Sequence, residues 1–364
     1  MTRHPDYMLV TLIGILVCAG LLILASASVA VSYQRFGSSS TYIVNQLLYG
    51  VGVGSIGFLV MQFVPYAMLR KLAIPILFMA LVLLAAVFTE QFGFRAGGAQ
   101  RWIYYKSIFF QPSELAKLAI VVYLAALFSR KRDALINFWQ GTFPFILVVG
   151  LILALITLEP DIGTVGIIAL TAGIMFFIAG GRLTYIGAGL AVAIALFFVL
   201  VQTAPYRMNR LTAFLHPELD PKGIGYQSHQ ALIAAGSGGV WGLGLGESRQ
   251  KYSFLPESVG DSIFAITAEE LGFVGASALV ALFVLFALRS YHIAYRAPDV
   301  FGRYLAIGIA SWISIQAFIN MAAISSLVPL TGVTLPFVSY GGSSLALTLT
   351  ACGILVNISK YARQ

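Results

Sequence analysis

The chain of 364 residues is too apolar to be a soluble globular protein. Hydrophobic residues make up 59% of it and charged residues only 10%, with a net charge of +8, whereas soluble domains average roughly 45–50% apolar and 25% charged residues. Ten separate stretches reach or approach the ~20 apolar residues that cross the hydrocarbon core of a bilayer. These stretches are continuous rather than alternating, which excludes a transmembrane β-barrel. The sequence therefore predicts an all-α polytopic membrane protein.

The apolar stretches predict a bundle of ten transmembrane helices in one domain, residues 1–364. In chain order they cover residues 7–31, 43–63, 72–88, 112–129, 143–158, 162–179, 183–202, 261–288, 301–327 and 342–358. If the N-terminus is cytoplasmic, twelve of the 22 Lys and Arg residues lie at the inner side and the short outer connections are nearly bare. Cytoplasmic connections carry such an excess of Lys and Arg, so both termini are predicted to be cytoplasmic.

Two longer connections then face outward, residues 90–111 and 203–260. The first mixes Arg and Lys with Trp and Tyr, a composition typical of the membrane interface. The second is a large extracytoplasmic loop between the seventh and eighth helices, and together with Asp261 it holds ten charged residues. A short helix at 226–235 and a glycine-rich run at 236–246 predict a structured lid on the membrane surface. We expect the chemistry of the protein to face outward.

Ionisable side chains in or beside apolar spans are costly in hydrocarbon, so each is a candidate for function. Glu114 and Lys117 are three residues apart on one helix face and can form an ion pair, either structural or lining an active cavity. Asp161 follows a Pro at an outer hairpin and is either a helix N-cap or a site residue. Asp261 opens the eighth span directly after the charged loop.

Six segments of the chain match a known set of motifs in the same order. They are QPSELAK at 111–117, PDIGT at 160–164, GYQS at 225–228, LPE at 255–257 with DSIFA at 261–265, EELG at 269–272 and PFVSYGGSS at 336–344. The chain thereby resembles the SEDS family, the shape, elongation, division and sporulation proteins. Residues 245–251 resemble the division branch, FtsW, more than the elongation branch, RodA. Where the family has His-Thr before its essential Asp, this chain has Val259 and Gly260.

The resemblance implies a peptidoglycan glycosyltransferase that polymerises lipid II at the outer face of the bacterial cytoplasmic membrane, during division or elongation. Asp261 is the position that matches the essential Asp of the family. A class B penicillin-binding protein, which cross-links the product, is the partner that the resemblance implies. Lipid II, the lipid-linked glycan strand and other divisome or elongasome membrane proteins are the remaining expected partners.

This reaction explains why such residues are needed. A base must take a proton from the incoming sugar hydroxyl, and a partly desolvated carboxylate has its pKa raised toward that task, so Asp261 is the predicted general base. Glu114 and Lys117 complete the predicted catalytic set. The leaving diphosphate needs charge stabilisation, and a single displacement predicts inversion at the anomeric carbon. The polyprenyl tail must stay in hydrocarbon, which predicts a groove between helices that opens sideways to lipid.

The predicted substrate-binding residues supply cations and hydrogen bonds at the outer side. They are Arg101, Gln111, Asp161, Arg207, Arg210, Gln227, Arg249, Lys251, Glu257 and Ser343. A divalent cation, Mg²⁺ or Mn²⁺, is expected to bridge the diphosphate, although the sequence contains no legible ligand set.

Two other functions stay open at this level. A lipid II flippase would use Glu114, Lys117 and Asp161 to line a polar path, but the charged residues gather at the outer face and not along a path. A noncatalytic scaffold that recruits the transpeptidase would tolerate replacement of Asp261.

Overall fold

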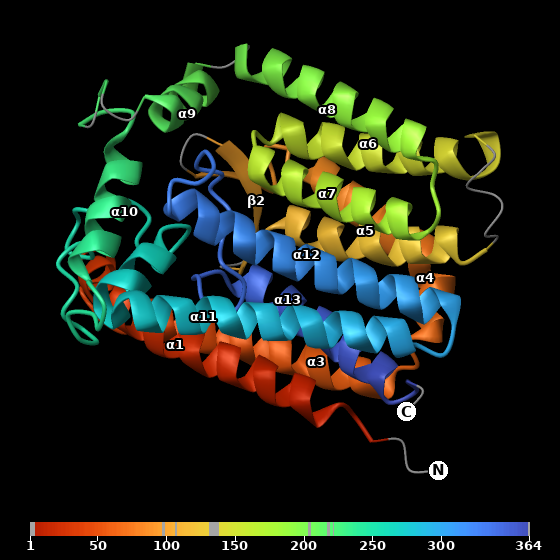
Figure 1. Ribbon diagram of the computed structural model, residues 1–364, viewed down its shortest axis with the longest axis horizontal. Coiled ribbons are helices and arrows are strands. Elements are labelled where there is room, and N and C mark those ends of the chain that lie inside the picture. Colours follow the sequence, from red (N-terminus) through yellow and green to blue (C-terminus); the bar gives the residue numbers. More distant parts are fainter. Residues whose placement is uncertain are drawn as a thin grey trace.

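The computed structural model describes residues 4–96, 99–105, 108–130, 138–202, 205–216, 219–220 and 222–362. Its long helices run side by side in one bundle, and a shorter helix, α10, lies across one end (Figure 1). The helices are α1 (Tyr7–Phe36), α2 (Thr41–Asn45), α3 (Val53–Phe63), α4 (Ala67–Ala86), α5 (Pro112–Phe128), α6 (Phe143–Leu158), α7 (Ile162–Ile178), α8 (Leu183–Gln202), α9 (Pro205–Leu215), α10 (Tyr226–Ser237), α11 (Ile263–Arg296), α12 (Val300–Ile324) and α13 (Gly342–Ser359), with π-helical segments η1 (Gln46–Gly52) and η3 (Phe138–Thr142).

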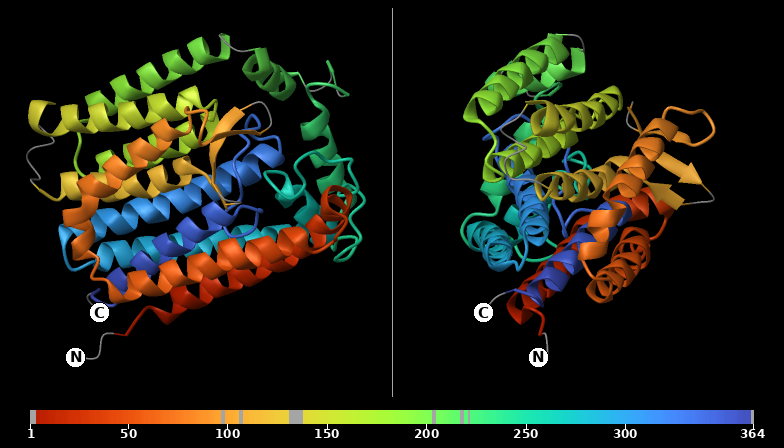
Figure 2. Two further views of the ribbon diagram at one scale, coloured as in Figure 1. Left: turned by 180° about the vertical axis from the view of Figure 1, so that it is seen from behind. Right: turned by 90° about the vertical axis from the view of Figure 1, so that its right-hand side faces the viewer.

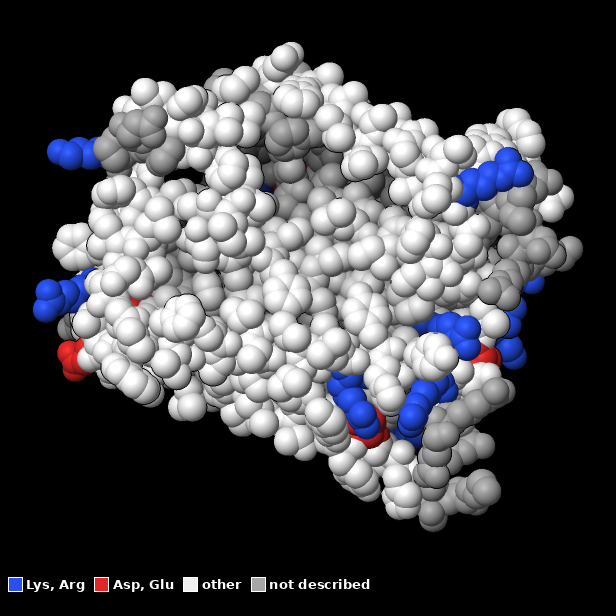
Figure 3. All heavy atoms as spheres, in the orientation of Figure 1, with Lys and Arg blue, Asp and Glu red and all other residues white. Residues whose placement is uncertain are grey.

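The chain is a multi-pass membrane protein. Within the described residues, seven helical stretches are long and apolar enough to cross a membrane, and two shorter apolar helices, Ile162–Ile178 and Leu183–Leu196, accompany them. Helix occupies each of the ten stretches in which a span is predicted. The face shown in Figure 3 agrees with this, because its charged side chains gather toward the two ends and leave an uncharged band between them.

A small β-sheet corrects the all-α prediction. Strands β1 (Gly93–Ala96), β2 (Ala99–Tyr105) and β3 (Ile108–Phe110) pair antiparallel in the order β1-β2-β3. The aromatic and β-branched residues of this segment favour a pleated, half-buried strand, but the prediction treated them only as interfacial residues. The sheet projects from one side of the bundle (Figure 2).

Helix α12 lies at the centre of the bundle and is buried along most of its length. It packs against α5, α7, α11 and α13. Helix α8, in contrast, packs mainly on α7 and α9 and exposes most of its described side chains. Side chains on α12 therefore reach several other helices, while α8 forms an edge of the molecule.

Helix α11 is broken at Gly272, where φ is 68° and ψ is −169°. The glycine-rich run after α10 fills the break and replaces the helical hydrogen bonds that it removes. The N–H groups of Leu243 and Gly244 donate to the carbonyls of Glu269 and Glu270 (3.0 Å each), and those of Phe273 and Val274 donate to the carbonyls of Gly239 and Val240 (2.9 and 3.2 Å). The loop that was predicted to form a lid on the membrane surface therefore inserts its glycine-rich part into the break in α11.

The break predicts that Gly242 tolerates no side chain. Its φ is +84°, and a Cβ there would lie 2.2 Å from the carbonyl oxygen of Glu270. A left-handed non-glycine residue alone costs about 1–3 kcal/mol, so Gly242→Ala should lower the melting temperature of the detergent-solubilised protein by several degrees. Gly150→Ala is the matched control, because Gly150 lies in α6 with nothing within 4 Å of its Cβ position. Equal melting temperatures for the two variants would contradict the prediction.

Candidate active site

Asp261 lies in the turn directly before α11 and is partly exposed. One carboxylate oxygen, Oδ1, accepts hydrogen bonds from Nε2 of Gln227 on α10 (3.1 Å) and from the hydroxyl of Ser262 (3.4 Å). The same Gln227 nitrogen also donates to the Ser262 hydroxyl at 3.0 Å. Neutral donors therefore hold one side of the carboxylate in place.

The other carboxylate oxygen, Oδ2, faces a space beside Arg210 of α9. A Cβ at Gly332 would lie 3.9 Å from Oδ2 of Asp261 and 3.6 Å from both terminal nitrogens of the Arg210 guanidinium. Gly332 has a φ of +72°, which favours glycine, and Arg210 is fixed by donating to the carbonyl of Leu330 at 3.3 Å. A carboxylate and a guanidinium thus border one small gap that a side chain at position 332 would fill.

The surroundings of Asp261 raise its pKa to about 6. Burial is the largest cause, because it disfavours the charged form, and the nearby carboxylate of Glu257 adds to it. Arg210 and the hydrogen bonds from Ser262 and Gln227 lower the pKa in opposition. A carboxylate with this pKa is mostly ionised at neutral pH yet basic enough to accept a proton, which suits a general base.

The predicted ion pair of Glu114 and Lys117 forms, and none of the bonds described for it reaches Asp261 or Arg210. The Lys117 ammonium is 2.9 Å from Oε1 of Glu114, and both side chains are buried between α5 and α12. Lys117 also donates to Oε1 of Gln316 at 2.7 Å and lies 5.2 Å from the centre of the Trp312 ring. Of the two interpretations, this geometry favours an ion pair that joins two helices.

Asp161 and Arg101 together build the hairpin between α6 and α7. The Asp161 carboxylate caps α7 by accepting from the backbone N–H (3.2 Å) and the hydroxyl (2.9 Å) of Thr164. From β2, Arg101 donates to the carbonyl of Glu159 at 3.0 Å and to the carbonyl of Pro160. The hairpin packs closely on residues 331–333, the segment that carries Gly332. Both side chains therefore shape a wall near the gap rather than facing it.

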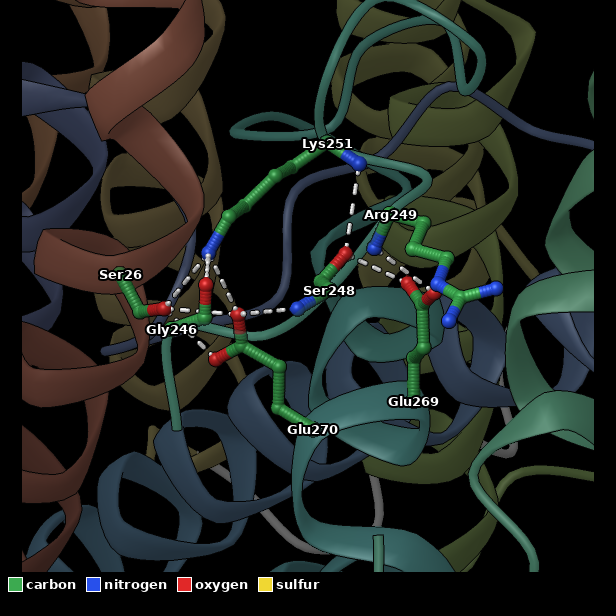
Figure 4. A network of polar contacts seen from close by, with 7 residues as sticks. All are labelled: Ser26, Gly246, Ser248, Arg249, Lys251, Glu269 and Glu270. Atoms are coloured by element: carbon green, nitrogen blue, oxygen red, sulfur yellow. Dashed lines mark hydrogen bonds and ion pairs between the residues drawn. The ribbon is translucent and has the colours of Figure 1, made fainter. Parts of the chain in front are cut away.

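Lys251 belongs to a network that anchors the glycine-rich loop at the break in α11 (Figure 4). Its ammonium is 2.9 Å from Oε1 of Glu270, and the Lys251 side chain is only 2% exposed. Ser26 of α1 donates to Glu270 at 2.7 Å, so the network also reaches the first helix. Glu269 accepts from the hydroxyl of Ser248 (2.5 Å) and from the backbone N–H of Arg249 (3.0 Å). The ammonium of Lys251 is thus engaged by Glu270, Ser26 and the carbonyl of Gly246, so the predicted diphosphate contact stays a prediction.

The remaining predicted substrate-binding residues lie in different surroundings. Gln111 precedes α5 as its N-cap residue, and Ser343 donates to the carbonyl of Phe109 in β3 at 3.2 Å. Arg249 and Glu257 are exposed. The side chain of Arg207 lies outside the described part of the structure. The structure therefore groups Arg210, Gln227 and Glu257 with Asp261.

An apolar groove runs along the surface between α7, α11 and α12. It has a volume of about 510 Å³ and is lined by Leu170, Ala287, Tyr291, Ser314, Ile315, Phe318, Ile319, Ala322 and Val328. A second hollow of about 60 Å³, under α9 and α10, shares Val328 with the groove and includes Ser228 and His229, which follow Gln227. The two hollows lead from the apolar surface toward the elements that carry Arg210 and Gln227.

The described residues contain no preformed metal centre. They hold no group of three or more His, Cys, Asp or Glu side chains placed to bind one ion. Mg²⁺ is commonly held by one or two carboxylates together with substrate phosphates, so the expected divalent cation stays a prediction.

The FtsW/RodA/SpoVE family model, described as cell cycle protein, matches residues 6–364. The chain belongs to this family. It is 40% identical over 359 residues to a probable peptidoglycan glycosyltransferase FtsW of Geobacter sp. strain M18, covering 98% of this chain and 97% of the relative. It is 39% identical over 360 residues to stage V sporulation protein E of Bacillus subtilis strain 168, covering 99% and 98%. The resemblance to the SEDS family, with the FtsW-like branch favoured, is confirmed.

A solved peptidoglycan synthase complex, described for its coordination of polymerization and crosslinking, contains a chain of the same fold. The TM-score is 0.79 with 27% sequence identity, over 98% of this chain and 97% of that chain. The likeness covers nearly the whole of both chains, so this SEDS protein shares the complete helical fold of that chain.

Uncharged amides near the site were missed in the sequence analysis, which considered only ionisable groups within the spans. Gln46, Gln316 and Asn320 are each 1% exposed. All three donate to backbone carbonyls within residues 333–339 of this SEDS chain, and Asn320 also donates to the carbonyl of Asp261. Burying an amide without a hydrogen bond costs about 2–7 kcal/mol, depending on the reference solvent used for the transfer. A Gln or Asn within an apolar stretch of the sequence therefore indicates a side chain that is hydrogen-bonded inside the protein.

Glu159 is a second buried carboxyl near the hairpin. It has no exposed surface, and within the described chain neither of its carboxylate oxygens has a hydrogen-bond partner. Burial raises its pKa to about 8, Asp161 adds to the rise and Arg101 opposes it. The carboxyl is thus mostly protonated at neutral pH.

This shift predicts a pH-dependent stability. The folded-state pKa of Glu159 lies above the unfolded value of about 4.5. Between these two pKa values only the unfolded state releases the proton. The free energy of unfolding is therefore highest, as far as Glu159 is concerned, below about pH 4.5 and falls as the pH rises toward about 8. Glu159→Gln cannot ionise, so its melting temperature should exceed that of the wild type by an amount that grows between pH 5 and pH 8. Glu247→Gln, which changes an exposed carboxylate, serves as the control. A constant difference across this pH range would refute the assignment.

Proposed function

We propose that this chain is a peptidoglycan glycosyltransferase that polymerises lipid II at the outer face of the cytoplasmic membrane. The observation that carries the proposal is the gap between Asp261 and Arg210. Arg210 donates to the carbonyl of Leu330, which lines the small hollow, and the small hollow shares Val328 with the apolar groove. A base, a cation for phosphate and a path for a lipid tail are the three parts that this reaction needs. The names of the FtsW relatives support the same activity.

Asp261 acts as the general base in this proposal. Its carboxylate takes the proton of the acceptor sugar hydroxyl while the hydroxyl oxygen bonds to the anomeric carbon of the donor. The bond from that carbon to the diphosphate breaks, and the diphosphate leaves with the electron pair. Arg210 stabilises the developing negative charge, because a guanidinium matches phosphate oxygens with two N–H groups. One displacement of this kind inverts the anomeric centre.

The apolar groove receives the polyprenyl tail of the substrate. A tail that stays in hydrocarbon can lie along α12 while its head reaches the hollow under α9 and α10 through the shared Val328. The groove supports the expected lateral opening to lipid. Any Mg²⁺ or Mn²⁺ enters with the diphosphate.

The topology that we propose has ten spans, with both termini in the cytoplasm. The start of α1 and the end of α13 lie together at one end of the bundle, where the N–H of Asp6 donates to the Ser359 hydroxyl at 3.0 Å (Figure 1). Arg289 pairs with Asp6 at 2.6 Å at the same end, and basic residues mark the cytoplasmic side. The loop at 203–260 then caps the outer end of one SEDS domain.

A class B penicillin-binding protein is the proposed partner. The neighbouring structure is part of a peptidoglycan synthase complex that couples polymerization to crosslinking. Proteins of the division machinery are further proposed partners, because the most similar curated relatives include several named FtsW.

Replacement of the base tests the reaction. Asp261→Asn keeps the size of the side chain but cannot accept the proton, so glycan synthesis from purified lipid II, in the presence of Mg²⁺ and the cognate transpeptidase, should fall at least about 100-fold, the lower range for general-base catalysis. Asp220→Asn changes an exposed carboxylate of the same loop that caps backbone N–H groups, and it should retain activity. Polymer from Asp261→Asn at the wild-type rate would remove Asp261 from the mechanism. If the wild type makes none, lipid II flipping is the next assay.

The pKa of Asp261 predicts how the rate depends on pH. The base works when ionised, so the rate should rise as the pH increases through about 6. Arg210 lowers this pKa, and Arg210→Gln should therefore move the midpoint to higher pH as well as slow the reaction. The measurement is the initial rate of glycan synthesis between pH 4.5 and 8. An unchanged midpoint in Arg210→Gln would contradict the proposed proximity of the two groups.

A further inference from the structure

Three consecutive backbone carbonyls of the Asp261 turn are held by donors from the C-terminal third of the chain. The carbonyl of Val259 accepts from the N–H of Tyr340 (2.9 Å), that of Gly260 from the hydroxyl of Ser339 (2.7 Å), and that of Asp261 from Nδ2 of Asn320 (2.8 Å). Residues 259–261 precede the first turn of α11, so no helix fixes them. Besides these three donors, the turn is held by the N–H groups of Gly260 and Ser262, which donate to the carbonyl of Glu257 (2.9 and 3.2 Å).

Asn320 holds two segments at once. Its Nδ2 donates both to the carbonyl of Asp261 and to the carbonyl of Val333 at 2.7 Å. The side chain is buried in α12 and 1% exposed, and the two carbonyl acceptors require the nitrogen, not the oxygen, on this side. Asn320 therefore joins the backbone of Asp261 to the irregular segment beside Gly332, on which Arg210 is anchored through Leu330.

Gln316 extends this arrangement one turn back along α12, on the same face. Its Nε2 donates to the carbonyl of Thr334 at 3.0 Å, and its Oε1 accepts from Lys117 (2.7 Å) and from the indole N–H of Trp312 (3.0 Å). The buried pair of Glu114 and Lys117 thus acts on residue 334 through Gln316. Two amides on α12 hold residues 333 and 334, and one of them also holds Asp261.

We propose that Asn320 is a positioning residue of the glycosyltransferase, which sets the distance between the Asp261 carboxylate and the Arg210 guanidinium by joining the backbones of residues 261 and 333. The expected effect on turnover rests on the proposed function. The expected effect on the position of the Asp261 turn rests on the structure alone. Asn320 is buried, so its side chain offers almost no surface to a substrate. The Glu114–Lys117 pair supports the same segment through Gln316, so its role is also one of positioning.

The chain supplies a matched control in Asn357 of α13. This Asn is also 1% exposed, and its Nδ2 also donates to two backbone carbonyls, of Gln62 at 2.9 Å and of Val64 at 3.1 Å. Its contacts lie at the end of the bundle where the termini meet (Figure 1). Asn320→Leu and Asn357→Leu therefore each remove two bonds from an amide to backbone carbonyls, at opposite ends of the molecule. Asn357→Leu also removes the bond that its Oδ1 accepts from the N–H of Tyr66 (3.3 Å), so the control is at least as disruptive as the test variant.

The experiment compares the full-length variants in two assays. In glycan synthesis from lipid II, Asn320→Leu should lower kcat by about 10–100-fold, the range expected when a reacting group is misplaced by about 1 Å, with KM within about twofold of the wild type. The pH midpoint should also shift, because the distance from Asp261 to Arg210 changes. Asn357→Leu should keep kcat, KM and the midpoint once the rate is normalised to folded protein. Asn320→Ser, which keeps one donor, should give an intermediate kcat and serves if the leucine variant does not fold.

The second assay is amide hydrogen exchange, which needs no activity. Peptides that cover residues 259–262 should exchange at least about tenfold faster in Asn320→Leu or Asn320→Ser, and at the wild-type rate in Asn357→Leu. The proposal is overturned if exchange in this turn is unchanged, or if both leucine variants lose kcat equally and keep the wild-type midpoint. A wild type that makes no glycan, while a known lipid II polymerase does in the same assay, would overturn the proposed function, and the exchange result would still decide the positioning of the turn.

Discussion

Inside a bilayer, every backbone N–H and C=O must find its partner within the protein, because no water is present to replace one. Long helices meet this requirement by themselves, but a site that needs an irregular turn does not. Here the break of α11 at Gly272 leaves carbonyls and N–H groups without helical partners, and the loop from Gly239 to Gly244 supplies them. The glycines are needed because backbone must approach backbone: a Cβ at Gly242 or Gly272 would lie within 2.3 Å of another main-chain atom.

The same requirement shapes the turn that carries Asp261. Its carbonyls precede α11 and are paired by a main-chain N–H, a hydroxyl and an amide from distant parts of the chain. On the far side of residues 331–333, the hairpin of α6 and α7 is held by Arg101 and capped by Asp161. Irregular segments thus meet around one small gap, and regular helices carry the side chains that fix them.

The sequence predicts the helices well because the signal for each is local. A run of apolar residues is enough to place a span, and α10 was expected from its amphipathic pattern near residues 226–235. Asp261 and Gln227 were also chosen as site residues, and the structure joins them by a hydrogen bond. What the sequence could not indicate is contact between distant segments. The pairing of Lys251 with Glu270 and the meeting of Arg210 with Gly332 depend on how the loop folds back, and no periodicity reports that. The sheet and the buried amides were missed for a different reason, since their signals are present but were given no weight.

The bond between Ser26 and Glu270 spans 244 positions of the chain. Helix α1 leaves the ribosome well before α11, which carries the carboxylate that accepts from the Ser26 hydroxyl, and Lys251 precedes that carboxylate by only a few turns' length of chain. Contacts of such sequence separation form late, because the intervening chain must be ordered first. Ser32, by comparison, donates to Ser38 a few residues away and can be satisfied early. During biosynthesis, therefore, the part of α1 that carries Ser26 lacks these partners until α11 has been made. It is then fixed by the same network that holds the glycine-rich loop at the break in α11.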